Sequence, residues 1–285
     1  MKNIHTIMLD LDGTALKPDN TMPAELTAYL RELHQRGHVV FVVSGRSRFE
    51  LSEVLPADFP ARGMVTANGM AVYAEGTKIY QSLLPDLLAR RLISDARKWR
   101  LYYEIYPLSG GRLAFQTDRT YMQQTLSGVR PPGVRINEWL SRLKAARQTT
   151  QWVESLDEST WQQIFKIYFF STQQGQMDDW KHHLEQLGKD ESFGFFSSSP
   201  NSVEVNTTGV SKASGLELLF KHYGLDREES LCIGDGENDL PMFDFAGHAV
   251  AMKNALPTII QHADEVTAFT NAENGVYRYL RQLFG

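Results

Sequence analysis

The 285-residue sequence predicts an α/β fold, in which a parallel sheet is covered by helices and a second α/β domain is inserted into the first. Three observations predict this arrangement. Short, continuously apolar segments alternate with amphipathic ones near both ends of the chain, as in a parallel sheet that is buried on both faces. The composition changes between residues 84 and 207, and the first pattern then returns, as expected when one domain interrupts another.

The N-terminal segment alternates strands and helices in the order that a parallel sheet requires. Residues 4–9 are mostly apolar and predict the first strand. Residues 23–36 predict a helix, because Pro23 suits a helix start, leucines recur on one face and Gly37 suits its end. Residues 39–43 predict a second buried strand, and residues 65–67 predict a third that ends at a turn-forming Asn-Gly pair.

The predicted inserted domain spans residues 84–207, and residues 1–83 and 208–285 form the domain that it interrupts. The insertion contains all five tryptophans and has 15 lysines and arginines against 14 aspartates and glutamates, whereas the remainder has 14 against 20. Residues 102–106, 112–117 and 164–170 predict strands of a half-exposed sheet, and residues 86–100 and 177–187 predict helices.

After residue 207 the sequence again predicts alternating helices and buried strands. Ser211 suits the N-cap of a helix that ends at Gly224. Residues 231–233, 249–252 and 265–267 predict three further strands of the interrupted sheet.

Charge and composition exclude several classes of protein. A net charge of −5 and a pI near 5.9 argue against a nucleic-acid partner held by electrostatics. The single cysteine, Cys232, lies in an apolar run and predicts a buried thiol. The N-terminus lacks the apolar region of a signal peptide, and no apolar run approaches the ~20 residues of a membrane span. We therefore expect a cytoplasmic protein that binds neither membranes nor nucleic acid.

Four polar clusters follow predicted strands or begin a predicted helix. They are Asp10 with Asp12, Ser44-Gly45, Lys212, and Asp235 with Asn238 and Asp239. The first cluster alone would be an ordinary polar turn, but the carboxyl ends of parallel strands share one edge, where all four would meet. Four acids close together need a cation, and oxygen ligands without histidine or cysteine suit Mg²⁺ better than zinc. With a lysine and a hydroxyl, this set predicts a phosphate site in which one carboxylate can attack phosphorus.

The same residues resemble the four ordered motifs of the haloacid dehalogenase superfamily. The motifs are Asp10-Leu11-Asp12-Gly13-Thr14, Ser44-Gly45-Arg46, Lys212 and Gly234-Asp235-Gly236-Glu237-Asn238-Asp239. Residues 68–69, 209–212 and 250–255 further resemble its Cof-type sugar-phosphate phosphatase branch, although Lys253 and Asn274 replace that branch's usual glycine and aspartate. The resemblance covers residues 1–83 and 208–285. It implies a Rossmann-like core and, from length and position alone, a large α/β cap in between.

The resemblance implies a Mg²⁺-dependent phosphatase, a phosphoric monoester hydrolase that acts on small phosphorylated metabolites through an aspartyl-phosphate. Sugar phosphates are the expected substrates. Asp10 would be the nucleophile and Asp12 the general acid and base. Metal binding falls to Asp10, the backbone carbonyl of Asp12 and Asp235, with Asp239 either a direct ligand or an anchor. Phosphate binding falls to Ser44, Gly45 and Lys212, and Asn238 would orient either Lys212 or the phosphate.

Several assignments stay open at this point. Arg46 either contacts substrate or forms a surface ion pair, and Asn68 either faces substrate or only shapes a turn. His182-His183 has no acid or cysteine at ligand spacing, and the basic run at residues 90–100 suits a solvated helix face. A phosphomutase or phosphotransferase is the catalytic alternative. A non-catalytic phosphometabolite-binding protein would lack one of the key acids. The expected oligomeric state is a monomer or a homodimer.

Overall fold

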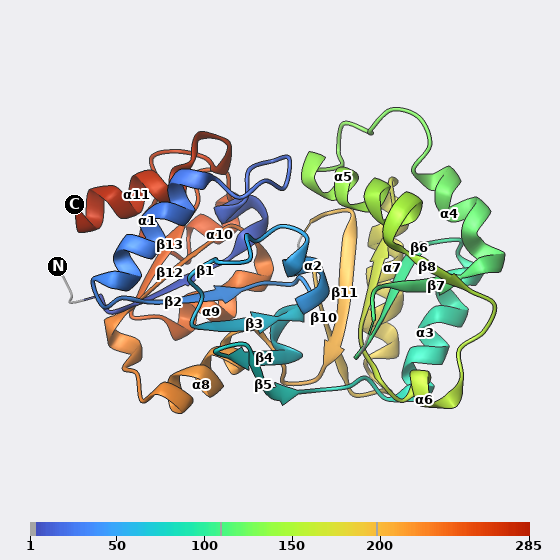
Figure 1. Cartoon of the computed structure of the whole chain (residues 1–285). Coiled ribbons are helices and arrows are strands. Elements are labelled where there is room, and N and C mark those ends of the chain that lie inside the picture. The colour runs from blue at the N-terminus through green and yellow to red at the C-terminus, as the bar shows by residue number, and fades with distance from the viewer. Residues whose placement is uncertain (1–3, 109, 198) are drawn as a thin grey trace. The chain divides into compact units, whose positions relative to one another are not determined.

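The computed structural model describes residues 4–108, 110–197 and 199–285, which divide into two compact units (Figure 1). The first unit contains the chain up to Gln81 together with Val210–Gly285. The second unit, Ser82–Gly209, is inserted between these two parts. In the described part of the chain, no helix has the length and apolar character that crossing a membrane needs.

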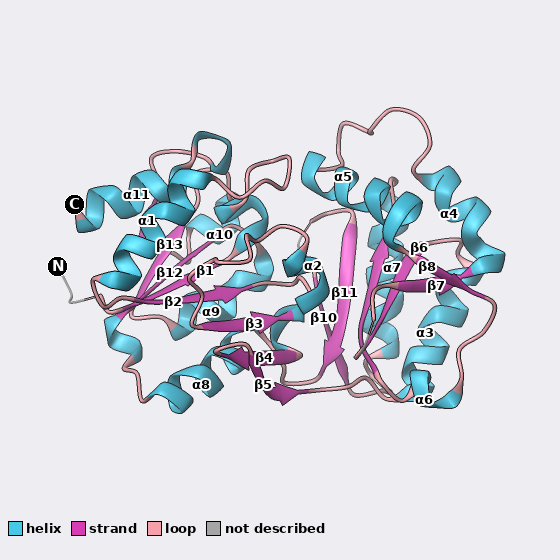
Figure 2. Ribbon diagram, in the orientation of Figure 1, coloured by secondary structure: helices cyan, strands magenta, loops and turns pink. Residues whose placement is uncertain are grey.

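The first unit is built on an eight-stranded sheet in the order β14-β13-β12-β1-β2-β3-β4-β5 (Figure 2). The strands are parallel from β14 to β3, and β4 and β5 add an antiparallel hairpin at one edge. Their bounds are β1 Thr6–Leu9, β2 Val39–Val43, β3 Gly63–Thr66, β4 Ala71–Ala74, β5 Thr77–Gln81, β12 Ser230–Gly234, β13 His248–Ala251 and β14 Glu265–Val266.

Helices cover both faces of this sheet. They are α1 Ala24–Gln35, α2 Arg48–Ser52, α8 Lys212–Tyr223, α9 Leu240–Phe245, α10 Pro257–Ile260 and α11 Gly275–Phe284. Successive strand residues point to opposite faces, so each apolar strand feeds two cores. Ile7 and Leu9 of β1 join the core beneath α1 and α11, whereas Met8 joins the core beneath α8 and α9.

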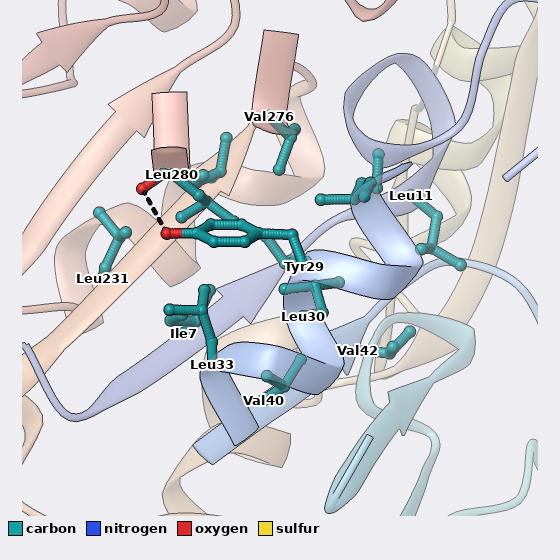
Figure 3. Packing of buried hydrophobic residues seen from close by; sticks show 14 of the residues in the cluster. Ile7, Leu11, Tyr29, Leu30, Leu33, Val40, Val42, Leu231, Val276 and Leu280 are labelled. Atoms are coloured by element: carbon teal, nitrogen blue, oxygen red, sulfur yellow. Dashed lines mark hydrogen bonds between the residues drawn. The ribbon is translucent and has the colours of Figure 1, made fainter. Parts of the chain in front are cut away.

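The core beneath α1 and α11 shows how closely these layers pack (Figure 3). Tyr29 of α1 is buried among the side chains of this cluster, and its hydroxyl donates a hydrogen bond of 3.4 Å to the backbone carbonyl of Leu280 in α11. Because a buried phenol needs a polar partner, this bond satisfies the hydroxyl while linking α1 to α11.

The second unit contains a mixed six-stranded sheet in the order β10-β11-β9-β6-β7-β8, in which β7 and β8 pair in parallel and the other neighbouring strands pair antiparallel. The strands are β6 Tyr102–Pro107, β7 Leu113–Phe115, β8 Gln151–Val153, β9 Ile164–Phe170, β10 Phe193–Phe196 and β11 Ser202–Thr207. The helices are α3 Asp86–Lys98, α4 Arg119–Thr125, α5 Ile136–Lys144, α6 Glu158–Trp161 and α7 Gln174–Leu187.

The predicted α/β architecture, with a parallel sheet and an inserted second sheet, is confirmed. Every strand and helix predicted in the first unit is present, but the β4–β5 hairpin was not predicted. The expectation that the inserted sheet is half exposed is wrong for β6 and β9, in which every residue is buried, whereas every residue of β8 and β10 is exposed or half-exposed. Its polar side chains pair with one another instead of facing water, as when Lys166 contacts Glu204 at 3.2 Å.

Candidate active site

The predicted polar clusters meet at the carboxyl ends of neighbouring strands in the first unit. Asp10 follows β1, Ser44 follows β2 and Asp235 follows β12, and these three strands are adjacent and parallel. The backbone N–H of Asp10 donates to the Ile233 carbonyl at 3.0 Å, which extends the β1–β12 ladder to the site itself. The topology therefore brings together residues that lie more than 200 positions apart in the sequence.

Lys212 is the centre of the charge cluster. It is the first residue of α8, and the side chain of Ser211 caps that helix by accepting from the backbone N–H of Ser214. The Lys212 ammonium is buried and donates to Asp10 Oδ1 at 2.6 Å and to Asp239 Oδ1 at 2.5 Å. Burial alone would lower the pKa of Lys212, but the negative charges of Asp10 and Asp239 outweigh burial and raise it. The lysine is therefore a permanent cation in this site.

Asp239 holds the loop that follows β12. Its Oδ2 accepts hydrogen bonds from the backbone N–H groups of Asp235 and Gly236, both at 2.9 Å, while its Oδ1 accepts from Lys212. Both oxygens are thus engaged by donors of the protein. Of the two roles predicted for Asp239, direct ligand or anchor, this arrangement favours the anchor.

Three buried carboxylates could hold a metal ion. Oxygen atoms of Asp10, Asp235 and Asp239 lie within 4.8 Å of one another. Burial raises the pKa of Asp10 and the neighbouring charge of Asp239 raises it further, whereas Lys212 lowers it. One lysine does not balance three acids, so a cation would stabilise the ionised cluster. An all-oxygen donor set of this kind fits Mg²⁺.

The loop from Asp10 to Leu16 is packed tightly against Asp235. Gly13 has a φ of +79°, and a Cβ at this position would lie 2.4 Å from Asp235 Oδ2. The hydroxyl of Thr14 donates to Asp235 Oδ1 at 3.3 Å. The glycine is therefore required both for its backbone conformation and for the approach of the loop to the carboxylate.

Two asparagines secure the same loop from its other side. Asn254 donates from Nδ2 to the Gly13 carbonyl at 2.8 Å, and its Oδ1 accepts from the backbone N–H of Asn271 at 2.9 Å. The side chain of Asn271 donates to the Leu16 carbonyl at 2.9 Å. The sequence predicts no role for Asn271, because an isolated asparagine in a turn gives no signal for such a contact.

Ser44, Asn68 and Asn238 form a second connected group. The turn at Ala67–Gly69 has positive φ at all three residues, and the Asn68 N–H donates to the Ser44 carbonyl at 3.1 Å. Asn238 was predicted to orient Lys212 or the phosphate, but its Nδ2 donates to Asn68 Oδ1 at 3.0 Å. Gly45 lies between Ser44 and Arg46 at the end of β2. The Asn-Gly turn therefore does more than reverse the chain, because it joins the β2 and β12 loops.

Arg46 does not act as a lone surface charge. Its Nε and Nη2 donate to the two carboxylate oxygens of Asp12, each at 2.7 Å, and Nη2 also donates to Asn20 Oδ1 at 2.8 Å. The ion-pair alternative for Arg46 thus has a specific partner inside the site. The sequence does not predict this role for Asn20, since nothing in its local sequence distinguishes it from other turn residues.

Known proteins match this chain over nearly its whole length. A model of the haloacid dehalogenase-like hydrolase family matches residues 7–280. A 5-amino-6-(5-phospho-D-ribitylamino)uracil phosphatase of Bacillus subtilis is 28% identical over 291 residues, which cover 97% of each chain. The solved structure of a haloacid dehalogenase-like hydrolase from B. subtilis has a TM-score of 0.82 at 24% identity and covers 99% of this chain and 100% of that one. A subclass IIB sugar phosphatase has a TM-score of 0.74 at 20% identity, with 98% of both chains covered.

Proposed function

The chain belongs to the haloacid dehalogenase-like hydrolase family and is a phosphatase of small phosphorylated metabolites, and on this premise we propose that it hydrolyses sugar phosphates through an aspartyl-phosphate on Asp10. The observation that carries the proposal is the bridge from Lys212 to Asp10 and Asp239. It supports a site with one acid held at the end of β1, a fixed cation beside it and a second acid that anchors both.

Asp10 has the surroundings that a nucleophilic carboxylate requires. Its side chain is buried at the end of a strand, and Lys212 holds one of its oxygens at 2.6 Å. A buried lysine offsets the repulsion between a phosphoryl dianion and the attacking carboxylate, which is the main obstacle to this reaction. Asp12 lies two residues further along the same loop and is partly exposed, so it suits proton transfer at the leaving oxygen better than nucleophilic attack.

We assign metal binding to Asp10, Asp235 and the backbone carbonyl of Asp12, with Asp239 as the anchor that fixes the loop of Asp235. A bound Mg²⁺ supplies positive charge that lowers the repulsion between the phosphoryl group and the acids. We assign the binding of phosphoryl oxygens to Ser44 and Gly45, and the bond between Asn68 and Asn238 supports this by joining the loops that follow β3 and β12.

Every residue assigned here lies in the first unit, so we assign the choice of substrate to the inserted unit, residues 82–209. The Bacillus subtilis relative described above is, by its name, a phosphatase of a uracil that carries a phosphorylated ribitylamino chain. This supports sugar phosphates and their reduced or aminated relatives as the substrate class for the present chain.

The test is a phosphate-release screen with Mg²⁺ over sugar phosphates, sugar-alcohol phosphates and nucleotides, with isomer formation followed in the same samples. Sugar phosphates should release phosphate fastest, and removal of Mg²⁺ should stop the reaction. Asp10→Asn should lower kcat by about 1,000-fold or more, because loss of a nucleophile removes the catalytic unit as a whole. Acid-quenched wild-type protein should carry one phosphoryl group on Asp10.

The matched control is Asp58→Asn, an exposed acid in the same unit that pairs only with Arg31 among the bonds observed for it. It should retain wild-type turnover. Phosphorylation of a residue other than Asp10, or near-normal turnover by Asp10→Asn, would contradict the proposed mechanism. Isomer formation faster than phosphate release would identify a mutase instead.

A further inference from the structure

The ion pair between Arg46 and Asp12 is bidentate, which is a more specific geometry than a surface ion pair requires. The guanidinium uses two different nitrogens, Nε and Nη2, to bind the two oxygens of one carboxylate, each at 2.7 Å. The Arg46 side chain is only 11% exposed, compared with 30% for Asp12. A bidentate pair of this kind fixes the plane of the carboxylate as well as its position.

Arg46 is itself held from three directions. Its backbone N–H donates to Ser44 Oγ at 3.1 Å, and its carbonyl accepts from the Ala67 N–H at 2.8 Å. Its Nη2 donates to Asn20 Oδ1 at 2.8 Å. Asn20 has a φ of +67° in the turn between Lys17 and Thr21, where the Lys17 N–H donates to the Thr21 carbonyl at 3.0 Å. The guanidinium is therefore placed by β2 on one side and by this turn on the other.

We propose that Arg46, held by Asn20, is a positioning residue for the proton transfer carried out by Asp12. The inference rests on the proposed function. In the first step the Asp10 carboxylate forms a bond to phosphorus while the bond from phosphorus to the leaving oxygen breaks. The proton of the Asp12 carboxyl group passes to that leaving oxygen, and Asp12 is left as a carboxylate paired with Arg46.

The planar fork of Arg46 gives this pair a fixed orientation. Because the guanidinium holds both oxygens of Asp12, it fixes the plane of the carboxyl group from which the proton passes to the leaving oxygen. In the second step Asp12 must accept a proton from water, and the same pair keeps its carboxylate oriented for that task. Asn20 contributes by fixing Nη2, the nitrogen shared between the two contacts.

This assignment differs in its consequences from the alternative that Arg46 binds the phosphoryl group of the substrate. Loss of a residue that binds the phosphoryl group would lower kcat/KM for all phosphate esters alike. A residue that positions the proton donor matters most for esters whose leaving group needs a proton, because a weakly basic leaving group departs without help. The dependence on the leaving group therefore separates the two roles.

The experiment compares phenyl phosphate with 4-nitrophenyl phosphate, which have similar shape but leaving groups of different basicity. The quantity measured is kcat/KM, which covers the steps up to release of the leaving group. Asp12→Asn should lose about 100-fold more activity with phenyl phosphate than with 4-nitrophenyl phosphate, within the range that general acids contribute. Arg46→Gln should show the same selective loss at about 10-fold.

Two further variants sharpen the result. Arg46→Lys keeps the charge but cannot bind both carboxylate oxygens as a planar fork, so it should retain the selective loss. Asn20→Gly removes the amide while suiting the positive φ, and should give a smaller selective loss of about 3-fold, because Arg46 remains. Arg31→Gln removes an exposed arginine of the same unit and should leave kcat/KM unchanged with both substrates.

The outcomes separate the inference from the proposed function. A selective loss in Asp12→Asn and in both Arg46 variants supports the inference. Equal losses with both esters in Arg46→Gln, together with full rescue by Arg46→Lys, would show that Arg46 supplies only charge, and would overturn the inference while the proposed function stands. A non-selective Asp12→Asn variant would overturn both, because Asp12 would not be the proton donor.

Discussion

Replacing Lys212 with methionine should destabilise the first unit, because it leaves two buried carboxylates without their shared cation. The ammonium lies 2.6 Å from Asp10 and 2.5 Å from Asp239 and has no exposed side-chain surface. Removing one partner from a buried ion pair costs about 3–5 kcal/mol. With an m-value of about 2 kcal/mol per molar urea, this corresponds to a fall of about 2 M in the urea midpoint.

The chain carries a separate probe for each unit. Cys232 is its single cysteine and is buried in β12, where burial raises the pKa of the thiol, so its labelling reports unfolding of the first unit. All five tryptophans lie in the inserted unit, so their fluorescence reports the second unit. In metal-free buffer, Lys212→Met should shift the labelling midpoint and leave the tryptophan midpoint nearly unchanged. Lys221→Met, an exposed substitution in the same helix, should shift neither.

The cost of Lys212→Met should depend on pH through Asp10. Burial raises the pKa of Asp10 in the folded state above its value in the unfolded chain. The folded state therefore loses stability as the pH rises above the unfolded-state pKa, because the buried carboxyl group must then ionise. Without Lys212 that effect is larger, and the difference between variant and wild type should grow from pH 5 to pH 8. Asp10→Asn in the Lys212→Met background should recover most of the loss. A variant within about 0.5 kcal/mol of wild type at pH 8, or no recovery in the double variant, would refute this reasoning.

Two other predictions concern the backbone and the metal. Gly13→Ala should lower both stability and turnover, because its Cβ would meet Asp235 at 2.4 Å. Gly37→Ala is the control, because Gly37 also has a positive φ but its Cβ would have no atom beyond those of the neighbouring residues within 4 Å; it should cost only about 1 kcal/mol by urea titration. Mg²⁺ at about 100 times its Kd should stabilise the wild-type protein by about 2.7 kcal/mol, and Asp235→Asn should abolish most of that gain in a thermal shift measurement. Comparable losses in both glycine variants, or an undiminished Mg²⁺ effect in Asp235→Asn, would count against these assignments.

The parallel core could be predicted from the sequence because its signals are local and strong. The strand at residues 39–43 is apolar at every position, and its predicted bounds match β2 residue for residue. The β4–β5 hairpin could not be predicted in the same way. Every residue of β5 is exposed or half-exposed, and the strand contains no long apolar run, so its pairing with β4 depends on contacts that only the folded sheet provides.

The inserted sheet misled the prediction for a related reason. Its alternating polar residues are typical of a sheet with one face in water. In the structure, Glu104 is buried and accepts hydrogen bonds from the hydroxyls of Tyr102 and Tyr106 and from Arg142. The same sequence pattern fits an exposed polar face and a buried polar network, and only the partners distinguish them.

Within the site, the convergence of Asp10, Lys212 and Asp239 followed from topology, whereas the partner of each side chain did not. The end of a parallel strand places a side chain such as that of Ser44 on the sheet edge. Arg46, two residues after Ser44, has a long side chain that can reach several acids. Arg46 has Asp12 as its partner because Ser44 and Ala67 fix its backbone and Asn20 fixes its guanidinium. These bonds join the segments that contain Asp12, Asn20, Arg46 and Ala67, and the sequence alone does not show how those segments lie relative to one another.

The unequal compensation of the buried acids supports the proposal that Asp10, rather than Asp239, is the nucleophile. Asp239 accepts two backbone N–H bonds as well as the bond from Lys212, so its charge is neutralised by groups that cannot move away. Asp10 shares the Lys212 ammonium with Asp239, and burial raises the pKa of Asp10. A carboxylate that is stabilised too little by its surroundings gains most from a cation and from bond formation to phosphorus. The imbalance that costs stability in the metal-free protein therefore supports Asp10, at the end of β1, as the proposed nucleophile.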